Sequence, residues 1–418
     1  MQSANVKMMN RNFGIATLAL VAVSSIHRRA GALEPDDFLL FSWEPVTVKP
    51  QLALAEVHND NLFYRPANKV SDWTTTLSPG LAILVGKRSD DFLTFNYTFN
   101  RYVYAERRDL DSSEHLFEFG SNLDGQHLSL RGTDRVQFLS SPVGNESKVL
   151  DPQAVDRPVF VTEANIDRTT FYDSYMLSYR PAEKAGVYLR GTHSAIDYET
   201  GVRLFDYRAL SLAGGFAYQA FPKATLFGEG YFGNTTSQPN LPAPSLPSIP
   251  FFGGAVGARG TFTPKITGTV QVGIEVRDFK SGPSLPPAPV ANLGLSYRLS
   301  EKTTLSLNYV RRQDVSVYYQ QQSYTSDVIS LQASQALGSK GKWRATLGGY
   351  YAMYNYDTTT FLGQRDYDVY TINFSLAYQI QLWLTASLGL DRTSVLEGGA
   401  GTGSYDVNRM TLRLAIGY

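Results

Sequence analysis

The sequence predicts an all-β protein, a single transmembrane antiparallel up-and-down β-barrel of about 18 strands, with about 16 to 18 as the range. Apolar and polar residues alternate along many segments, and short turns alternate with long loops between those segments. Tyr (26), Phe (23) and Gly (35) are abundant beside a hydrophobic fraction of only 43%. In such a barrel half of each strand faces water and aromatic residues gather at both membrane interfaces, which fits this composition.

Length, charge and cysteine content exclude several classes of protein. The 418 residues could form one barrel, and Lys+Arg and Asp+Glu are both 38, so no excess charge points to a nucleic acid partner. The chain has no cysteine, which excludes a disulfide framework and any thiolate metal site.

The first residues predict a secretory signal over 1–32. Lys7 and Arg11 precede an apolar run at 14–26, and Ala30-Gly31-Ala32 offers a site for a signal peptidase. A membrane anchor is the alternative, but the run falls short of the roughly 20 apolar residues of a spanning helix. Residues 33–46 are expected to form a periplasmic lead-in segment that plugs or braces the inner mouth, and 47–418 the barrel.

Strand periodicity is clearest in three segments, Phe92–Tyr104, Ile266–Asp278 and Tyr367–Ile380. In each of them apolar residues occupy every second position and polar or small residues lie between them. Soluble β-sandwiches also alternate in this way, so the periodicity alone does not establish a barrel.

The lengths of the connections distinguish a membrane barrel from a soluble β-sandwich, because short and long connections alternate along the chain. Short turns follow aromatic strand ends at 179–184, 218–223, 262–265 and 297–302. Long polar or Pro-rich loops are expected near 58–72, 106–114, 142–165, 199–206, 236–251, 279–289, 319–325, 357–366 and 395–405. Short periplasmic turns and longer extracellular loops are typical of outer-membrane barrels, and both termini would then be periplasmic.

The last strand predicts an assembly signal. Its apolar positions alternate with small, polar or charged ones and end on an aromatic residue, as in the closing strand of bacterial outer-membrane barrels. The expected signal residues are Met410, Leu412, Leu414, Ile416 and Tyr418. We expect that deletion of 416–418, or Tyr418→Asp, blocks membrane assembly without blocking export.

A wide barrel encloses an aqueous lumen, so the polar strand face is where function is expected. With the apolar face toward lipid, the lumen-lining candidates are Arg131, Arg190, Arg259, Arg277, Arg344, Arg413, Glu118, Glu229, Glu275 and Asp391. They form either a pore lining of both signs, slightly favouring anionic or hydroxyl-rich solutes, or paired charges that support the wall. The loops Pro142–Ile166 and Ser237–Phe251 either fold inward as a constriction or stay exposed.

No catalytic or cofactor site is predicted. The histidines after residue 32 are His58, His115, His127 and His193, and they are scattered along the chain. His193 and Ser194 are adjacent, so their side chains point to opposite faces of a strand, which is wrong for a nucleophile and its base. The run 58–61 could ligate calcium together with Asp72, but a polar run of this kind is more often a turn, and no metal site is assigned.

One segment resembles a known family. Residues 59–73 read NDNLFYRPANKVSDW, and residues 75–81 read TTLSPGL. The Asp-Asn-Leu-Phe run, the Asn-Lys-x-Ser-Asp loop and the Ser-Pro-Gly strand resemble the opening hairpin of a family of bacterial outer-membrane β-barrel porins, the second β-barrel porin group. The resemblance implies an outer-membrane barrel, with some relatives associated with export of surface polysaccharide. It implies no catalytic residues.

The function expected from these patterns is a porin-like channel for hydrophilic solutes in the bacterial outer membrane, with saccharides or a surface-polysaccharide role as the candidate. The alternative is a non-conducting barrel whose outer loops serve as an adhesin, assembly or structural surface. The expected partners are outer-membrane lipid, the barrel assembly machinery and small hydrophilic solutes, with no nucleic acid and no enzymatic activity. No outward patch stands out in the sequence as an oligomer seam.

Overall fold

The computed structural model describes residues 39–87, 91–142, 163–199, 205–239, 247–278, 286–315, 323–338, 341–356, 366–397 and 404–417. The described residues from Leu39 onward belong to one compact unit. Its strands are β1 (Phe41–Trp43), β2 (Val46–Asn59), β3 (Asp72–Gly86), β4 (Phe92–Tyr104), β5 (Ser112–Asp124), β6 (Leu128–Ser141), β7 (Ile166–Ala182), β8 (Ala185–Tyr198), β9 (Phe205–Phe221), β10 (Ala224–Pro239), β11 (Ile249–Thr263), β12 (Ile266–Arg277), β13 (Ala288–Arg298), β14 (Thr303–Val315), β15 (Ser323–Leu337), β16 (Trp343–Tyr356), β17 (Tyr367–Gln381), β18 (Leu384–Glu397) and β19 (Tyr405–Ile416). A 3-10 turn, η1 (Arg108–Leu110), lies between β4 and β5.

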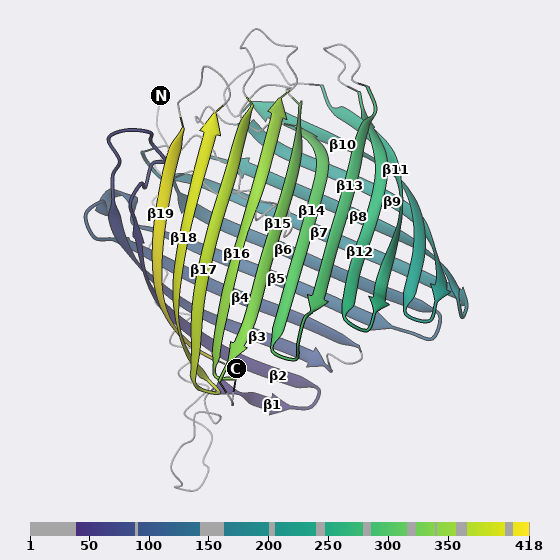
Figure 1. Ribbon diagram of the computed structural model, residues 1–418, viewed down its shortest axis with the longest axis horizontal. Helices are drawn as coiled ribbons and strands as arrows, with labels where there is room; N and C mark the ends of the chain where they lie inside the picture. The colour runs from purple at the N-terminus through teal and green to yellow at the C-terminus, as the bar shows by residue number, and fades with distance from the viewer. Residues whose placement is uncertain are drawn as a thin grey trace, which may run out of the picture. The chain divides into compact units, whose positions relative to one another are not determined.

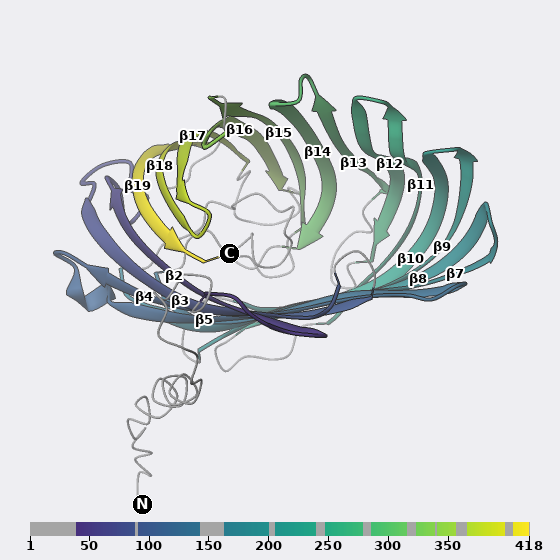
Figure 2. The ribbon, with the colours of Figure 1, turned by 90° about the horizontal axis from the view of Figure 1, so that it is seen from below.

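Strands β2 to β19 form a closed antiparallel ring. Each strand pairs with the next along the chain, and the ring closes where β19 pairs with β2, from Arg409 opposite Asn59 to Ile416 opposite Leu52. Figure 1 shows the barrel from the side, and Figure 2 shows the ring from below, with β2 next to β19. The prediction of an up-and-down barrel of about 18 strands is therefore confirmed.

The connections differ in length between the two ends of the barrel. At one end, which we call the short-turn end, the connections have two to five residues: 87–91, 125–127, 183–184, 222–223, 264–265, 299–302, 338–342 and 382–383. At the opposite, long-loop end the connections include 60–71, 142–165 and 240–248. This is the sorting that the sequence predicted. In outer-membrane barrels the short-turn end is periplasmic and the long-loop end extracellular.

The outer face of the barrel is apolar. Its side chains include Val256, Leu331 and Ile372, each more than 60% exposed. A closed barrel satisfies every ladder hydrogen bond within the sheet, so such a surface is stable against lipid. These apolar positions alternate with the inner ones along every long strand, which is the pattern of a barrel embedded in a bacterial outer membrane. Within the described residues, no helix has the length and apolar character needed to span a bilayer.

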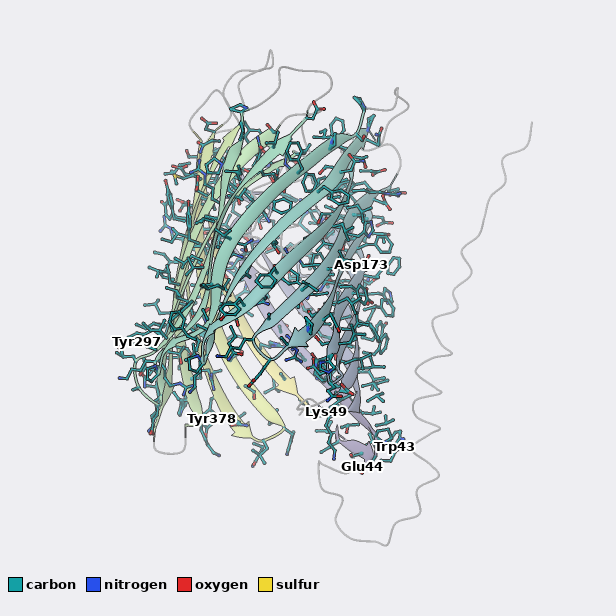
Figure 3. The ribbon with its side chains drawn as sticks, turned by 90° about the vertical axis from the view of Figure 1, so that its right-hand side faces the viewer. Trp43, Glu44, Lys49, Asp173, Tyr297 and Tyr378 are labelled. Atoms are coloured by element: carbon teal, nitrogen blue, oxygen red, sulfur yellow. The ribbon has the colours of Figure 1, made fainter. Side chains whose placement is uncertain are left out.

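Aromatic side chains mark the membrane interface near the short-turn end. Tyr297 and Tyr378 lie toward this end of the barrel (Figure 3), and Trp343 stacks on Tyr378 with ring centroids 4.4 Å apart. Tyr179, Tyr218 and other exposed rings also end strands there. Amphipathic rings at this level are the girdle expected at a membrane–water interface.

Part of the predicted lead-in segment is ordered against the barrel. Strand β1 pairs antiparallel with the start of β2, with Phe41 opposite Val48 and Trp43 opposite Val46. It therefore extends the sheet by a short hairpin at the short-turn end. The predicted signal over 1–32 lies outside the described residues, and its role and cleavage stay predictions.

Candidate functional site: the charged inner wall

The strand face opposite the apolar one carries the ionisable side chains of the candidate site. The parity of the exposed apolar neighbours places all ten predicted lumen-lining residues on this inner face. Eight of them lie on β5, β6, β8, β10, β11, β12 and β16, and the other two on β18 and β19. Whether they line a path for solute stays a prediction, but their partners are visible in the structure.

Glu229 on β10 is the centre of one hydrogen-bonded group. Arg190 on β8 donates to its carboxylate at 2.8 and 3.0 Å, and the Tyr188 hydroxyl donates at 2.9 Å. Gln271 on β12 donates through Nε2 at 3.0 Å. The Glu229 side chain is only 4% exposed, so these donors replace the water that its charge would otherwise require.

Glycines on neighbouring strands give the inner aromatic rings room to lie along the wall. A Cβ on Gly215 would come within 2.2 Å of the Tyr188 ring, and one on Gly257 within 2.6 Å of the Phe227 ring. Because the rings occupy this space, the Tyr188 hydroxyl reaches Glu229 and does not project across the lumen. The Arg259 guanidinium lies 5.4 Å from the Phe227 ring centroid and 5.9 Å from that of Tyr188, a cation–π arrangement.

A second group is centred on Arg277, at the long-loop end of β12. Its Nε donates to Glu275 at 2.7 Å and its Nη1 to the Thr235 hydroxyl at 3.2 Å. The guanidinium carbon lies 4.6 Å from the centroid of the Phe251 ring. Arg277 and Glu275 are each only 7% exposed, so this is a buried ion pair that depends on both partners.

Beside this group one hydrogen bond joins two strands that lie five places apart in the sheet. The Tyr207 hydroxyl on β9 donates to Asp314 on β14 at 3.2 Å. The two residues are 107 positions apart in the chain. Side chains from β9 to β14 thus meet across the inner side near the long-loop end, and we call this contact and the Arg277 group the inner bridge.

A cavity of about 300 Å³ opens on the inner wall of this same arc. Its lining is mixed, with Arg190, Glu229, Glu275 and Arg312 supplying charge and Gln271 and Asn292 supplying amides. A recess of this composition can hold a small polar solute through hydrogen bonds to charged and neutral groups.

Three more of the predicted residues are paired on other parts of the wall. Glu118 accepts from Arg135 Nε at 2.9 Å, and Asp391 accepts from Arg409 Nε at 3.0 Å. Arg131 donates to Asn122 at 2.9 Å and lies 3.5 Å from the Asp124 carboxylate. For these residues the structure favours the interpretation of paired wall charges.

Three inner arginines have no carboxylate within ion-pair distance among the described residues. They are Arg259 on β11, Arg344 on β16 and Arg413 on β19. All three lie nearer the short-turn end than the long-loop end of their strands. Lys49 on β2 also faces inward near that end, beside a smaller cavity of about 150 Å³ (Figure 3). The inner wall therefore carries uncompensated positive charge toward the short-turn end.

Sequence reasoning missed several inner residues. Arg135 and Arg409 obey the same parity as the predicted set, so the alternation could have identified them. The same holds for Glu114, which accepts hydrogen bonds from Asn100 at 3.0 Å, Tyr102 at 2.6 Å and Gln137. No sequence signal identifies the contact of Tyr207 with Asp314, because it depends on where β9 and β14 lie in the closed ring.

A group of tyrosines near the long-loop end was also not predicted. Tyr324, Tyr354 and Tyr356 are buried on the inner side of β15 and β16, packed with Val369 and Val395. Tyr354 stacks on Tyr367 with centroids 4.7 Å apart. The larger parts of the loops Pro142–Ile166 and Ser237–Phe251 lie outside the described residues, and the two interpretations of these loops stay open.

The Asn61 and Asp72 side chains, which were considered as calcium ligands, form hydrogen bonds with backbone groups. Asp72 accepts from the amide nitrogens of Trp73, Glu106 and Arg107 at 2.7 to 3.2 Å. The side chain of Asn61 bonds Arg65 and the Asp406 carbonyl. The contact of Asn61 with Asp406 ties the first hairpin to β19 at the ring closure. In the described ranges no group of three or more His, Cys, Asp or Glu side chains is placed to hold a metal ion.

Among the described residues the histidines form no catalytic arrangement with a nucleophile. His115 contacts the Tyr97 hydroxyl at 3.0 Å, and His127 contacts the Arg180 carbonyl at 3.0 Å. His58 packs against Trp73. His193 pairs with Asp173 at 2.8 Å, and no Ser or Thr hydroxyl hydrogen bonds to its ring in the part of the chain that the structure describes.

The expected assembly strand is β19. Its apolar residues Met410, Leu412, Leu414 and Ile416 lie on the outer face, and Leu412 and Leu414 are exposed. Arg413 faces inward, as expected. Tyr418 lies outside the described residues, and the role of this strand as an assembly signal stays a prediction.

Comparisons with known proteins add a general likeness. No protein-family model matches the chain, so membership in the porin family stays a prediction, and no curated protein matches it. Among solved structures, the chain is similar to the outer membrane protein opdK from Pseudomonas aeruginosa (9% identity, TM-score 0.45, covering 88% of this chain and 98% of that one). It is also similar to OccK3 (OpdO) from the same organism (12% identity, TM-score 0.45, covering 88% and 95%).

A third similar structure is the ferric citrate transporter FecA in its unliganded form, with 11% identity and a TM-score of 0.43 over 84% of this chain. The chain spans only 60% of the length of that transporter. None of these similarities indicates which solute this protein binds or transports. Ring closure, the apolar outer face and the sorted connections identify this protein as an 18-stranded barrel of the bacterial outer membrane.

Proposed function

We propose that the barrel is a channel for hydrophilic solutes, with a wall that favours anionic or hydroxyl-rich solutes such as saccharides. The proposal rests on the distribution of charge over the inner face. Its carboxylates are held in ion pairs and hydrogen bonds, whereas Arg259, Arg344 and Arg413 have no carboxylate partner among the described residues. A wall of this kind presents net positive potential to a solute.

The chemistry of the wall supports hydroxyl-rich solutes as well as anions. Arginine presents a planar array of donors that matches carboxylate and phosphate oxygens, and it also donates to neutral hydroxyl oxygens. The cavity beside Glu229 adds acceptors and the amides of Gln271 and Asn292. Aromatic rings held flat by the glycines provide apolar surface on which a sugar ring could rest.

The inner bridge is the proposed constriction. It lies near the long-loop end, where Tyr207 and Asp314 join across the inner side and Arg277 is buried. The unpaired arginines lie toward the opposite end. In this proposal a solute entering from the long-loop end passes the narrow region first and the positive region afterwards.

Single-channel recording in planar bilayers tests the proposal. We expect discrete conductance steps, with a reversal potential in a KCl gradient that shows preference for chloride. The triple variant R259Q/R344Q/R413Q should shift that potential toward the cation side. The control is R208Q/R392Q, since both arginines lie on the outer face near the long-loop end. Absence of steps from the wild type, or equal shifts in both variants, would contradict the proposal.

The polysaccharide role remains a finer proposal that rests on the resemblance of residues 59–81. It is tested by adding uncharged and uronic-acid oligosaccharides to the recorded channel. Brief blockades whose frequency rises with oligosaccharide concentration would support it, and unchanged current at all concentrations would oppose it.

The second candidate function is a non-conducting barrel that presents its outer loops. The inner bridge and the buried tyrosines near the long-loop end favour it, because both fill space that a wide pore would leave open. Absence of conductance from the wild type together with conductance from Y207A/R277A would support this candidate over the channel.

Delivery to the membrane is also part of the proposal. We infer export by the segment 1–32 and insertion by the barrel assembly machinery through β19. Outer-membrane fractionation of a chain lacking 416–418 tests this, with loss from the outer membrane and accumulation in the periplasm as the expected result.

A further inference from the structure

Four polar side chains lie on the outer, apolar face of the barrel, and we call them the outer-face cluster. They are Asp134 on β6, Asp173 and Tyr175 on β7, and His193 on β8. The Cα atoms of Asp134, Asp173 and His193 are direct partners across the three strands. They share their strand faces with Phe138, Leu177 and Leu189, which are exposed apolar residues. Their parity is therefore that of the lipid-facing surface.

The cluster is internally bonded but not covered. His193 Nδ1 lies 2.8 Å from Asp173 Oδ2, and the Tyr175 hydroxyl donates to Asp134. The side chains of His193 and Asp173 remain 37% and 35% exposed. Each of the two carboxylates therefore has one hydrogen-bond partner within the cluster, the His193 imidazole or the Tyr175 hydroxyl. The polar atoms of the cluster remain partly exposed on the outer surface of the barrel.

On β6 the cluster lies between apolar outward residues, and on β8 and β9 the next charged outward residues toward the long-loop end are Asp197 and Arg208. On β6 the outward residues Leu128 and Leu130 come before Asp134, and Val136 and Phe138 come after it. Asp173 is six residues from Tyr179 of the aromatic girdle, which is about 15 Å of membrane depth for a strand tilted by about 40°. Figure 3 shows Asp173 well away from the end marked by Trp43 and Glu44.

Ionisable groups at this depth are costly against acyl chains, and in membrane proteins they normally face protein or water. On the inner face this chain buries such groups among its own donors, as in the inner bridge. The outer-face cluster has no comparable cover from its own chain among the described residues. A polar partner in the membrane plane would remove the cost.

The surface beside the cluster is open and nearly free of side chains. A Cβ on Gly191 or on Gly214 would meet nothing within 4 Å. Gly214 lies in register with Gly230 on β10, and Gly230 with Gly254 on β11, all facing outward. Protruding residues border this strip, with Leu210 and Phe232 each 62% exposed. Small residues let two membrane surfaces approach closely, and the neighbouring large ones can fill the space that they leave.

We propose that a second copy of this chain covers the outer-face cluster, so that the outer faces of β6 to β9 form the centre of a homodimer seam. Two copies insert in the same direction, so their clusters lie at equal depth in the membrane. The cluster contains both hydrogen-bond donors and acceptors, and the strip contains both protrusions and open space. A two-fold axis along the membrane normal between β7 and β8 sets the two clusters against each other and places the outer face of β9 beside the partner's β6.

Cysteine substitution tests the seam directly, because the natural chain contains no cysteine. Leu210→Cys places a thiol opposite His193, at an exposed position that leaves the cluster intact. The controls are Leu331→Cys and Ile372→Cys, both 61% exposed on strands outside the seam. In native outer membranes treated with a short bis-maleimide, we expect a band at twice the monomer mass for L210C, at least fivefold stronger than for either control.

A second variant separates the cluster from the rest of the face. D134L/D173L/H193L should insert normally but lose most of the L210C cross-link and run as monomer in mild detergent, where the wild type runs as dimer. Equal cross-linking of L210C and the controls, a cross-link of L210C only to another protein, or a dimer that survives the triple substitution would each overturn the proposal. Channel conductance is recorded separately, so loss of the dimer and loss of the pore are distinguishable.

Discussion

The two faces of the barrel wall carry ionisable pairs in very different surroundings. Glu275 and Arg277 on the inner face of β12 are each 7% exposed and are bonded on several sides. Asp173 and His193 on the outer faces of β7 and β8 are more than a third exposed. The same alternation of side chains thus gives one pair a protein environment and the other a lipid environment. We expect substitutions of the two pairs to have effects of opposite sign.

The largest expected effect comes from breaking the inner pair. Arg277→Leu leaves Glu275 buried without its partner, and we expect a loss of about 3 to 5 kcal/mol of unfolding free energy. Guanidinium titration of the barrel in lipid vesicles, followed by tryptophan fluorescence, measures it. The double variant E275L/R277L should recover most of the loss, because no charge remains buried. A double variant as unstable as the single one would show that the pair matters through its shape and not its charge.

The next effect compares the two faces of one strand. Val272→Arg places a charge on the outer face of β12, where Val272 is 55% exposed, and we expect a loss of about 2 to 4 kcal/mol near the membrane midplane. Thr269→Arg on the inner face should cost less than about 1 kcal/mol because the lumen is polar. The same titration measures both variants. Equal losses would mean that the two faces are not in different solvents.

A smaller effect of opposite sign is expected at the outer-face cluster. D134L/D173L/H193L removes polar groups from the lipid face, and the isolated monomer should gain about 1 to 2 kcal/mol. The measurement is unfolding at high dilution in vesicles, where association does not contribute. A destabilised monomer would show that the cluster supports its own barrel, which would remove the contrast with the inner pair.

The smallest effect tests the contact across the inner side. Tyr207→Phe removes the hydrogen bond to Asp314 and should cost about 1 kcal/mol while raising single-channel conductance. Tyr188→Phe is the matched control, because it loses a bond to Glu229 that runs along the wall. It should cost a similar amount and leave the conductance unchanged. If both variants conduct alike, the inner bridge is not the constriction.

The inner site was predictable to the extent that it follows strand parity. Arg190, Glu229, Glu275 and Arg277 lie on the expected face because side chains two residues apart share a face, whatever the rest of the fold does. Their partners were not predictable. The pairing of Arg190 with Glu229, two strands away, requires the registers of β8, β9 and β10 as well as the parity.

The outer-face cluster shows the limit of the same reasoning. Alternation read along β6, β7 and β8 indicates that Asp134, Asp173 and His193 occupy positions where apolar residues are expected. It does not reveal that these three exceptions are register partners, since each register depends on where the preceding turn ends. Isolated exceptions in a sequence therefore became one surface feature only in the folded sheet.

The amino-acid sequence by itself determined the barrel, its strand number to within two, the sorting of turns and loops, and the face on which each side chain lies. These properties depend on neighbours within a few residues, through the two-residue period of the strand and the chemistry of its turns. Only the tertiary structure decided which charges pair, that Tyr207 meets Asp314, and that the outer polar residues converge. Those contacts depend on inter-strand register and on ring closure, which bring together residues that are distant in the chain.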